Sequence, residues 1–260
     1  AAGKWNMTLS SADTMIARAT RDHVDYTLFM QAEEGLGAYL MAQPGISRIE
    51  DLRGRLLAGD PGDSNLDLVR MKMMRSHGLG EDDYRVEIIG NTPERAKAFL
   101  AGKVEAAMLT PPSSEKVLAA GGVMLASAED YVPDWPLACG WGLRSWVEGN
   151  RDLVVRFIRA WAASCDWLLR PENREETLAL LMAREGLTRE RAEHAYIRVV
   201  PKGAINPEAI RKNMELRIEL GVYPPPHHAA EHFYDTSYWC TATGLAAPPA
   251  AGWPGNAVKP

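Results

Sequence analysis

The chain has 260 residues, of which 46% are apolar and 24% charged. This composition is typical of a globular protein, and the length allows one large core or two smaller ones. The net charge is −5, and Lys and Arg are scattered rather than gathered into a stripe, which argues against a nucleic-acid-binding protein. No apolar run approaches the roughly 20 residues of a membrane span. No apolar run of the signal-peptide kind follows residues 1–4.

The first half of the chain alternates strand-like and helix-like segments. Apolar runs bounded by turn residues predict strands over residues 5–9, 24–30, 36–42, 55–59, 85–89, 105–109, 123–126 and 138–143. Helical spacing of apolar residues appears over residues 13–20, 65–77, 93–101 and 112–120. Because strands and helices alternate with short connections, we expect parallel sheets covered by helices.

The second half of the chain is predicted to be mainly helical. Residues 151–169 place apolar side chains three and four positions apart, which predicts an amphipathic helix. Further helices are expected over residues 175–184, 189–199 and 207–220. Asn206 can cap the last of these, Pro207 suits its first turn, and Gly221 ends it. From about Gly244 the composition shifts to Ala, Pro and Gly, which predicts a loosely packed tail.

Neither the cysteines nor the histidines form a recognisable metal-binding motif. The cysteines permit at most one disulfide, leave the redox compartment undecided and are expected as small buried hydrophobes: Cys139, Cys165 and Cys240. A short histidine tract follows three prolines, but no Cys or carboxylate stands at a metal-binding distance from it: His227, His228 and His232. We therefore expect no metal and no other cofactor.

Several turns between a predicted strand and a predicted helix are rich in polar residues. In residues 60–65, Gly and Pro predict a tight turn. The backbone amides and the dipole at the start of the next helix suit a carboxylate, sulfonate or phosphate. The candidate binding residues are Asp63, Ser64 and Asn65, although the Asp63 carboxylate can itself occupy such a site. Helix capping is the alternative role for Ser64 and Asn65.

Three further turns repeat this pattern. The candidates that they contribute either hold the polar head of a ligand or cap a helix. They are Ser10, Ser11 and Asp13 in residues 10–13, Asn91 and Thr92 after the strand at 85–89, and Thr110 after the strand at 105–109. Polar turns that recur at strand ends are what a ligand crevice at the edge of an open α/β sheet requires.

An aromatic side chain completes the set of candidates. Trp141 lies in a predicted strand and can stack on a flat ligand, although Trp141 and the nearby Tyr131, Trp135 and Trp146 can equally pack in a core. Motifs of catalysis are absent from the sequence: there is no Gly-x-Ser-x-Gly elbow, no His-Glu-x-x-His and no phosphate-binding loop. These observations favour a binding protein over an enzyme.

An ordered series of segments resembles the solute-binding proteins of ABC importers. Residues 46–55 are similar to the I-K-S-I-x-D-L-K-G-K stretch of that family, and residues 101–112 to its A-G-x-V-D-A-A-x-L-x-P-P stretch. Residues 167–174 and 233–239 match in the same order, and the resemblance runs from about Thr8 to Tyr238. It is strongest to the branch that binds nitrate, sulfonates, taurine and thiamine precursors.

The resemblance implies an α/β fold of the periplasmic-binding-protein type II class, with two lobes and two hinge crossovers. Lobe 1 would comprise residues 1–40 and 140–260, and lobe 2 residues 41–139. The family normally begins with a strand and a helix before the matched part, so lobe 1 is expected without them. Residues 10–13 match the ligand turn T-S-A-D-N, and residues 63–65 match the second-lobe anion turn, where Asp63 replaces a small neutral residue.

The resemblance also implies a function. It indicates an extracytoplasmic substrate-binding protein, periplasmic or lipid-anchored, that captures a small anionic or polar-headed organic solute for an ABC importer. The expected partners of this monomer are the small-molecule ligand and the membrane permease, with no nucleic acid. Sulfonates, nitrate, aromatic carboxylates and pyrimidines are all candidate ligands. The alternatives are an enzyme on the same fold with a small aromatic or pyrimidine-type substrate, and a ligand-sensing module of a regulator.

Overall fold

The structure is a computed structural model that describes residues 6–60 and 64–249. The chain divides into two compact units. Unit 1 comprises residues 1–34, 136–214 and 225–260, and unit 2 comprises residues 35–135 and 215–224. From the sequence, we expected the boundaries after residues 40 and 139, with residues 215–224 in the first lobe. Of the ten candidate site residues, Asp63 lies outside the described residues.

Unit 2 contains a five-stranded sheet in the order β5-β4-β6-β3-β7. Its strands are β3 (Tyr39–Ala42), β4 (Leu56–Gly59), β5 (Arg85–Ile88), β6 (Ala106–Leu109) and β7 (Val123–Ser127). Strand β4 pairs with β5 and β6 in parallel, whereas β3 pairs with β6 and β7 in antiparallel fashion. The prediction of parallel sheets was therefore wrong for the two pairs that β3 forms. Strand β3 runs opposite to both of its neighbours, β6 and β7.

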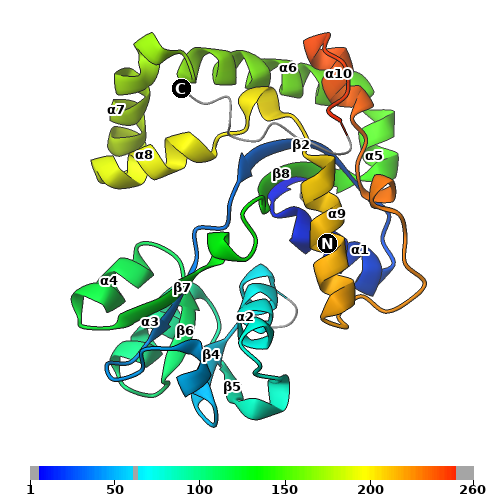
Figure 1. Ribbon diagram of the computed structural model, residues 1–260. Coiled ribbons are helices and arrows are strands. Elements are labelled where there is room, and N and C mark those ends of the chain that lie inside the picture. Colours follow the sequence, from blue (N-terminus) through cyan, green and yellow to red (C-terminus); the bar gives the residue numbers. More distant parts are fainter. Residues whose placement is uncertain (1–5, 61–63, 250–260) are drawn as a thin grey trace. The chain divides into compact units, whose positions relative to one another are not determined.

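Three helices cover the sheet of unit 2. They are α2 (Asn65–Ser76), α3 (Thr92–Leu100) and α4 (Ser113–Ala119). Helices α3 and α4 contact β6 and β3 respectively, and the core that they close contains Phe99 of α3, Val117 of α4 and Leu109 of β6 (Figure 1). The carboxyl ends of β4, β5 and β6 lie on one edge of the sheet because these three strands are parallel.

Unit 1 contains an antiparallel sheet in the order β1-β8-β2. Its strands are β1 (Met7–Ser10), β2 (Tyr26–Glu34) and β8 (Pro136–Leu143). A Cβ atom on Gly140 would lie 2.6 Å from Cε2 of Phe29, so a glycine is required where the two strands meet. This sheet also corrects the expectation of parallel strands. The chain leaves unit 1 at the end of β2 and returns beside that point to begin β8, so these two strands run in opposite directions.

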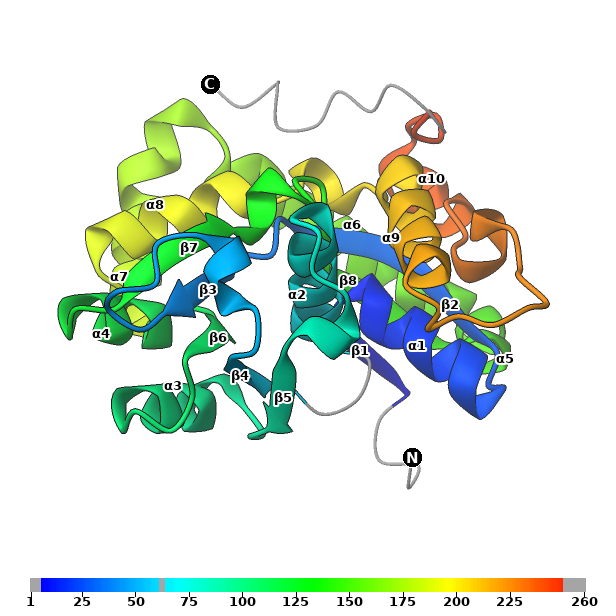
Figure 2. The same ribbon diagram turned by 60° about the horizontal axis from the view of Figure 1, so that its bottom comes forward.

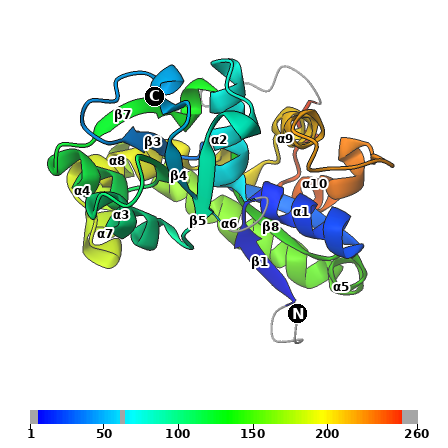
Figure 3. The ribbon, with the colours of Figure 1, turned by 90° about the horizontal axis from the view of Figure 1, so that it is seen from below.

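The helices of unit 1 surround this sheet. They are α1 (Ala12–Asp22), α5 (Arg144–Gly149), α6 (Arg151–Leu168), α7 (Arg174–Glu185), α8 (Arg189–Arg198) and α10 (Ser237–Thr243). Helix α10 packs along α6 (Figure 2), and α1 packs against β8 (Figure 3). Helix α9 (Pro207–Glu219) continues across the unit boundary at residue 214. The predicted Asn206 cap of α9 is confirmed, because Asn206 Oδ1 accepts a hydrogen bond from the backbone N–H of Ala209 at 3.1 Å.

Short 3-10 helices complete the elements: η1 (Ile49–Leu52), η2 (Glu81–Asp83), η3 (Ala128–Asp130), η4 (Pro171–Asn173), η5 (Pro201–Gly203) and η6 (Ala230–Phe233). Helices α5 and α10 were not predicted. Residues 244–249 carry neither helix nor strand. Among the described residues, none of the helices has the length and apolar character that crossing a membrane requires.

Candidate functional site

A row of side chains crosses the sheet of unit 1 directly below the start of α1. Ser10 of β1 and Gln31 of β2 both pair with Cys139 of β8, one on each side. Directly paired residues of neighbouring strands point to the same face of a sheet. The backbone of Ala12, the first residue of α1, hydrogen-bonds the Cys139 thiol. The predicted candidate Ser10 therefore lies in a polar row that the N-terminal end of α1 covers.

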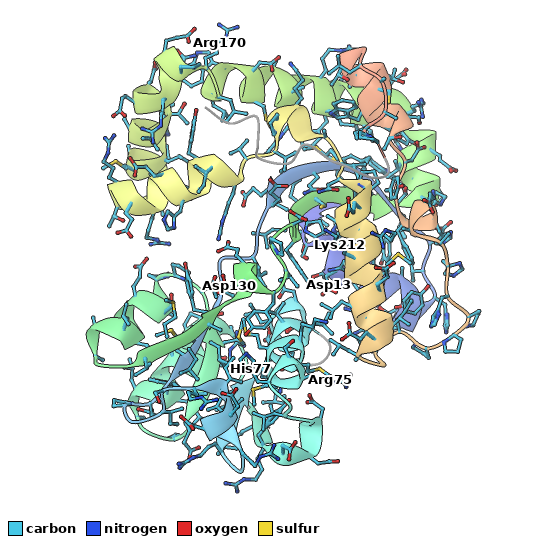
Figure 4. All side chains as sticks on the ribbon, in the orientation of Figure 1. Asp13, Arg75, His77, Asp130, Arg170 and Lys212 are labelled. Carbon is cyan, nitrogen blue, oxygen red and sulfur yellow. The ribbon has the colours of Figure 1, made fainter. Side chains whose placement is uncertain are left out.

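The first turn of α1 adds two more predicted candidates. Ser11 is the N-cap residue, but its side chain makes no capping hydrogen bond, and it is buried. Asp13 is only 1% exposed and projects from the first turn of α1 (Figure 4). A carboxylate at this position is stabilised by the positive end of the helix dipole. Capping through the Ser11 hydroxyl, the alternative considered above, is not what the structure shows.

Trp141 shares the sheet face of this row. It stands two residues from Cys139 on β8, and alternate residues of a strand point to the same side. Its ring meets the ring of Tyr26 edge-on, with the centroids 5.1 Å apart. The indole is 6% exposed, and its Nε1–H has no partner among the described residues. Ser10, Ser11 and Asp13 thus lie at the start of α1, and Trp141 lies on the next row of the same sheet face.

Gln31 belongs to this site and was not among the predicted candidates. It is fully buried, and its Oε1 accepts a hydrogen bond of 3.0 Å from the backbone N–H of Asn206. Its Nε2 has no hydrogen-bond partner among the described residues. An amide inside the otherwise apolar run of residues 28–32 is the sequence signal that could have identified it, since a polar residue in a buried strand requires a partner.

In unit 2, several predicted candidates have local structural roles. Ser64 Oγ caps α2 by accepting a hydrogen bond from the N–H of Asp67, and Asn65 Oδ1 accepts one from the N–H of Leu66. Asn91 is exposed and forms a capping box with Glu94 at the start of α3, in which each side chain accepts a hydrogen bond from the backbone N–H of the other residue. For Ser64 and Asn91, the capping role, weighed against ligand binding from the sequence, is the one that these contacts show.

Arg95 ties together the strand ends of unit 2. The guanidinium is 1% exposed and forms an ion pair of 2.9 Å with Asp60, which follows β4. It donates to Thr92 Oγ1 at 3.0 Å, to the Met108 carbonyl at 3.3 Å and to the Gly90 carbonyl. Thr92 is therefore engaged inside the unit. Arg95 was not among the predicted site residues, and its buried role could not be read from its charge.

The end of β6 contributes the last predicted candidate. The half-buried Thr110 accepts hydrogen bonds at its carbonyl oxygen from the N–H groups of Ser113 and Ser114, at 3.0 and 3.2 Å. Ser114 Oγ is buried, without a partner among the described residues. Thr110 and Ser114 lie at the same sheet edge as the Arg95 network, because β4 and β6 are parallel.

A separate polar cluster of unit 2 lies at the C-terminal end of α2. His77 contacts Glu50 of η1 through Nδ1 at 3.0 Å and Tyr131 through Nε2 at 2.8 Å. The hydrogen bond with His77 is the main cause that lowers the pKa of Glu50 to about 2. Burial raises the pKa of Tyr131. His77 is labelled in Figure 4. Among the described residues, no group of three or more His, Cys, Asp or Glu is arranged to hold a metal ion.

Trp135 and Trp146, which were also weighed as ligand contacts, pack inside the units, whereas Tyr131 contacts His77. Trp135 is 3% exposed, and Trp146 packs against the core cluster of unit 1. This is the core-packing alternative that the sequence left open.

Comparison with protein families gives a match to the family described as "NMT1/THI5 like" over residues 1–174. The chain belongs to the NMT1/THI5-like family. No match was found among curated protein sequences. The resemblance found in the sequence is thus confirmed at the level of the family, which covers the first two thirds of the chain.

Solved structures show the fold of this NMT1/THI5-like protein. The periplasmic aliphatic sulphonate binding protein SsuA from Escherichia coli has 19% identity and a TM-score of 0.67, and the match covers 90% of this chain and 77% of that one. The alkanesulfonate-binding protein SsuA from Xanthomonas axonopodis pv. citri, bound to MOPS, has 16% identity, a TM-score of 0.70 and coverage of 90% and 82%. The desulfurization enzyme DSZB has 12% identity, a TM-score of 0.68 and coverage of 92% and 85%. The predicted periplasmic-binding-protein fold is confirmed.

Proposed function

We propose that this NMT1/THI5-like protein is the extracytoplasmic substrate-binding component of an ABC importer and captures a small anionic or polar-headed organic solute. The proposal is supported by family membership, by a fold shared with sulfonate-binding proteins and by the division into two compact units. Its partners would be the solute and a membrane permease, and its location the periplasm or the outer surface of a membrane. We expect it to act as a monomer.

The observation that carries the proposal is the buried polar site under α1. Gln31 and Trp141 present N–H groups without a partner among the described residues, on the face that the start of α1 covers. Buried N–H donors favour an acceptor oxygen, such as those of a carboxylate or sulfonate. The geometry suits recognition by hydrogen bonds.

The chain crosses between the units after residue 34 and again after residue 135, and these two crossings support a hinge between the units. Glu34 pairs with Pro136 at the end of the unit 1 sheet, and the N–H of Gly35 donates to the carbonyl of Trp135 at 2.8 Å. The two crossing segments therefore run side by side. In this proposal they are the hinge crossovers, and ligand binding shifts the population toward a closed state.

A thermal-shift screen tests the proposed function. The probes are ethanesulfonate, taurine, sodium nitrate, benzoate and a hydroxymethylpyrimidine. A compound present at about 100 times its Kd stabilises the native state by about 2.7 kcal/mol. In a chain of this length that corresponds to a Tm increase of about 5–10 °C. Failure of every probe to raise the Tm of the folded protein would refute the proposed function.

The enzyme alternative predicts turnover of one of these compounds, which mass spectrometry after incubation would detect. The cysteine at the candidate site, Cys139, does not favour the enzyme alternative. Cys139 is fully buried, and burial raises the pKa of its thiol well above the usual range. A nucleophilic cysteine requires a lowered pKa and access to the substrate. The described part of the site therefore offers no activated thiol.

A further inference from the structure

Gln31 is held in one orientation by a single backbone contact. Its Oε1 accepts the N–H of Asn206 at 3.0 Å. Only the oxygen of the amide can accept this hydrogen bond, so the position of Nε2 follows from it. The side chain is completely buried, in the row with Ser10 and Cys139. Two amide hydrogens are thus aimed from a fixed point inside unit 1.

These hydrogens find no acceptor among the described residues. The Cys139 thiol in the same row is engaged, since it donates to the Pro136 carbonyl and is hydrogen-bonded by the backbone of Ala12. Buried amides in native proteins almost always have a partner, because desolvating an unpaired donor costs free energy. An acceptor from outside the described residues would complete the site.

Trp141, on the next row of the same sheet face, also carries a hydrogen-bond donor without a partner among the described residues. This donor is the buried indole Nε1–H. An indole nitrogen can only donate, and so can the amide nitrogen of a glutamine. Because both groups can only donate, each is complemented by an acceptor oxygen. Carboxylates and sulfonates have this chemistry.

Gln43 of unit 2 provides an internal comparison. Its Nε2 donates to the Phe99 carbonyl at 2.7 Å and to the Val104 carbonyl at 3.1 Å. Both amide hydrogens of Gln43 are therefore used to join segments of the protein. The contrast indicates that Gln31 is not a structural glutamine of the same type.

We propose that Gln31 is a specificity-determining residue of the ligand site, whose Nε2 donates a hydrogen bond to an acceptor oxygen of a carboxylate, sulfonate or similar anionic head group. This inference rests on the proposed function and adds to it a residue and the chemistry of the group that it recognises. Asn206 is the positioning residue, because its backbone N–H orients the amide.

The test compares Gln31→Glu with the wild type and with Gln43→Glu. The carboxylate that Gln31→Glu introduces retains an oxygen for the Asn206 N–H but replaces the donor group by a second oxygen. Ethanesulfonate and nitrate serve as probes, because neither titrates between about pH 5 and pH 8. By isothermal titration calorimetry at about pH 8, Gln31→Glu should weaken the binding of the better probe by about 10- to 100-fold.

The pH dependence separates loss of a donor from simple damage. At about pH 5 the buried carboxyl of the Gln31→Glu variant should be partly protonated and can donate again. Part of the affinity should therefore return relative to the wild type measured at the same pH, which also controls for titration of the nearby Asp13 carboxyl. Gln43→Glu should lower the Tm, because it breaks two hydrogen bonds, but should leave the affinity unchanged. Side-chain amide NMR signals of the wild type give a readout without a variant: those of Gln31 should shift on probe addition and those of Gln43 should not.

The possible failures are distinguishable. If the wild type binds a probe, and Gln31→Glu binds it equally well with no shift of the Gln31 amide signals, the amide serves a bound water and the inference is overturned while the proposed function stands. If neither probe nor any other compound of the screen binds the folded wild type, the proposed function is refuted and the inference with it. If Gln31→Glu does not fold, the NMR measurement decides.

Discussion

Replacement of Arg95 by methionine should destabilise unit 2 more than any surface change. Methionine has a similar length but no donors, so the variant loses the ion pair with Asp60 and three further hydrogen bonds, to Gly90, Thr92 and Met108. Breaking a buried ion pair by removal of one partner typically costs about 3–5 kcal/mol. The separate hydrogen bonds are not additive to this figure, since one side chain makes them all. We expect a loss of about 3–5 kcal/mol.

Urea denaturation followed by far-UV circular dichroism measures this loss. The matched control is Arg53→Met, because Arg53 also pairs with a carboxylate, that of Asp83, but its side chain is 57% exposed. An exposed ion pair contributes about 0–1 kcal/mol. Arg95→Met should therefore lower the urea midpoint of unit 2 clearly, and Arg53→Met only slightly. If both variants lose less than about 1 kcal/mol, Arg95 does not join the strand ends as described.

Three other predictions follow from single groups. Burial raises the pKa of the Glu33 carboxyl above its unfolded value of 4.5. The ionised carboxylate therefore destabilises the fold at pH values above the raised pKa, and this cost is absent below pH 4.5. Glu33→Gln should raise the Tm at neutral pH but not in acid, and a lower Tm at neutral pH would contradict this. NMR titration should find the pKa of Glu50 near 2 in the wild type and closer to 4.5 in His77→Ala, whereas an unchanged value would exclude the hydrogen bond as its cause. A thiol reagent should label the half-buried Cys240 of the native protein first. Rapid labelling of a second cysteine would contradict the burial of the other two thiols. The thiols expected to react only after unfolding are buried, with raised pKa values: Cys139 and Cys165.

Local signals in the sequence located most of the helices. The apolar spacing in residues 151–169 predicted α6, which the structure has as Arg151–Leu168. Asn206, Pro207 and Gly221 marked the two ends of α9 correctly. These signals are reliable because a helix forms its hydrogen bonds between residues four positions apart, and its caps lie next to it. Helices α5 and α10 were missed because their 6 and 7 residues are too few to show a helical spacing of apolar residues; α10 packs against α6.

The resemblance in the sequence also indicated the family and the fold, and both are confirmed. It did not indicate which polar turn residues cap helices. Ser64 and Asn91 occupy N-cap positions, where the hydroxyl or amide oxygen satisfies a backbone N–H of the first turn. Capping and ligand binding use the same residue types, so the sequence could name these candidates but not separate the two roles.

The amino-acid sequence by itself determined the local structure of this protein: where helices begin and end, and which segments are buried. Only the tertiary structure decided the direction of the strands and the composition of the site under α1. Gln31 and Cys139 are 108 positions apart in the chain and meet because β2 and β8 pair in one register. A shift of that register by one residue would turn Gln31 to the opposite face. Strand pairing is a long-range interaction, and no pattern within either strand specifies its partner.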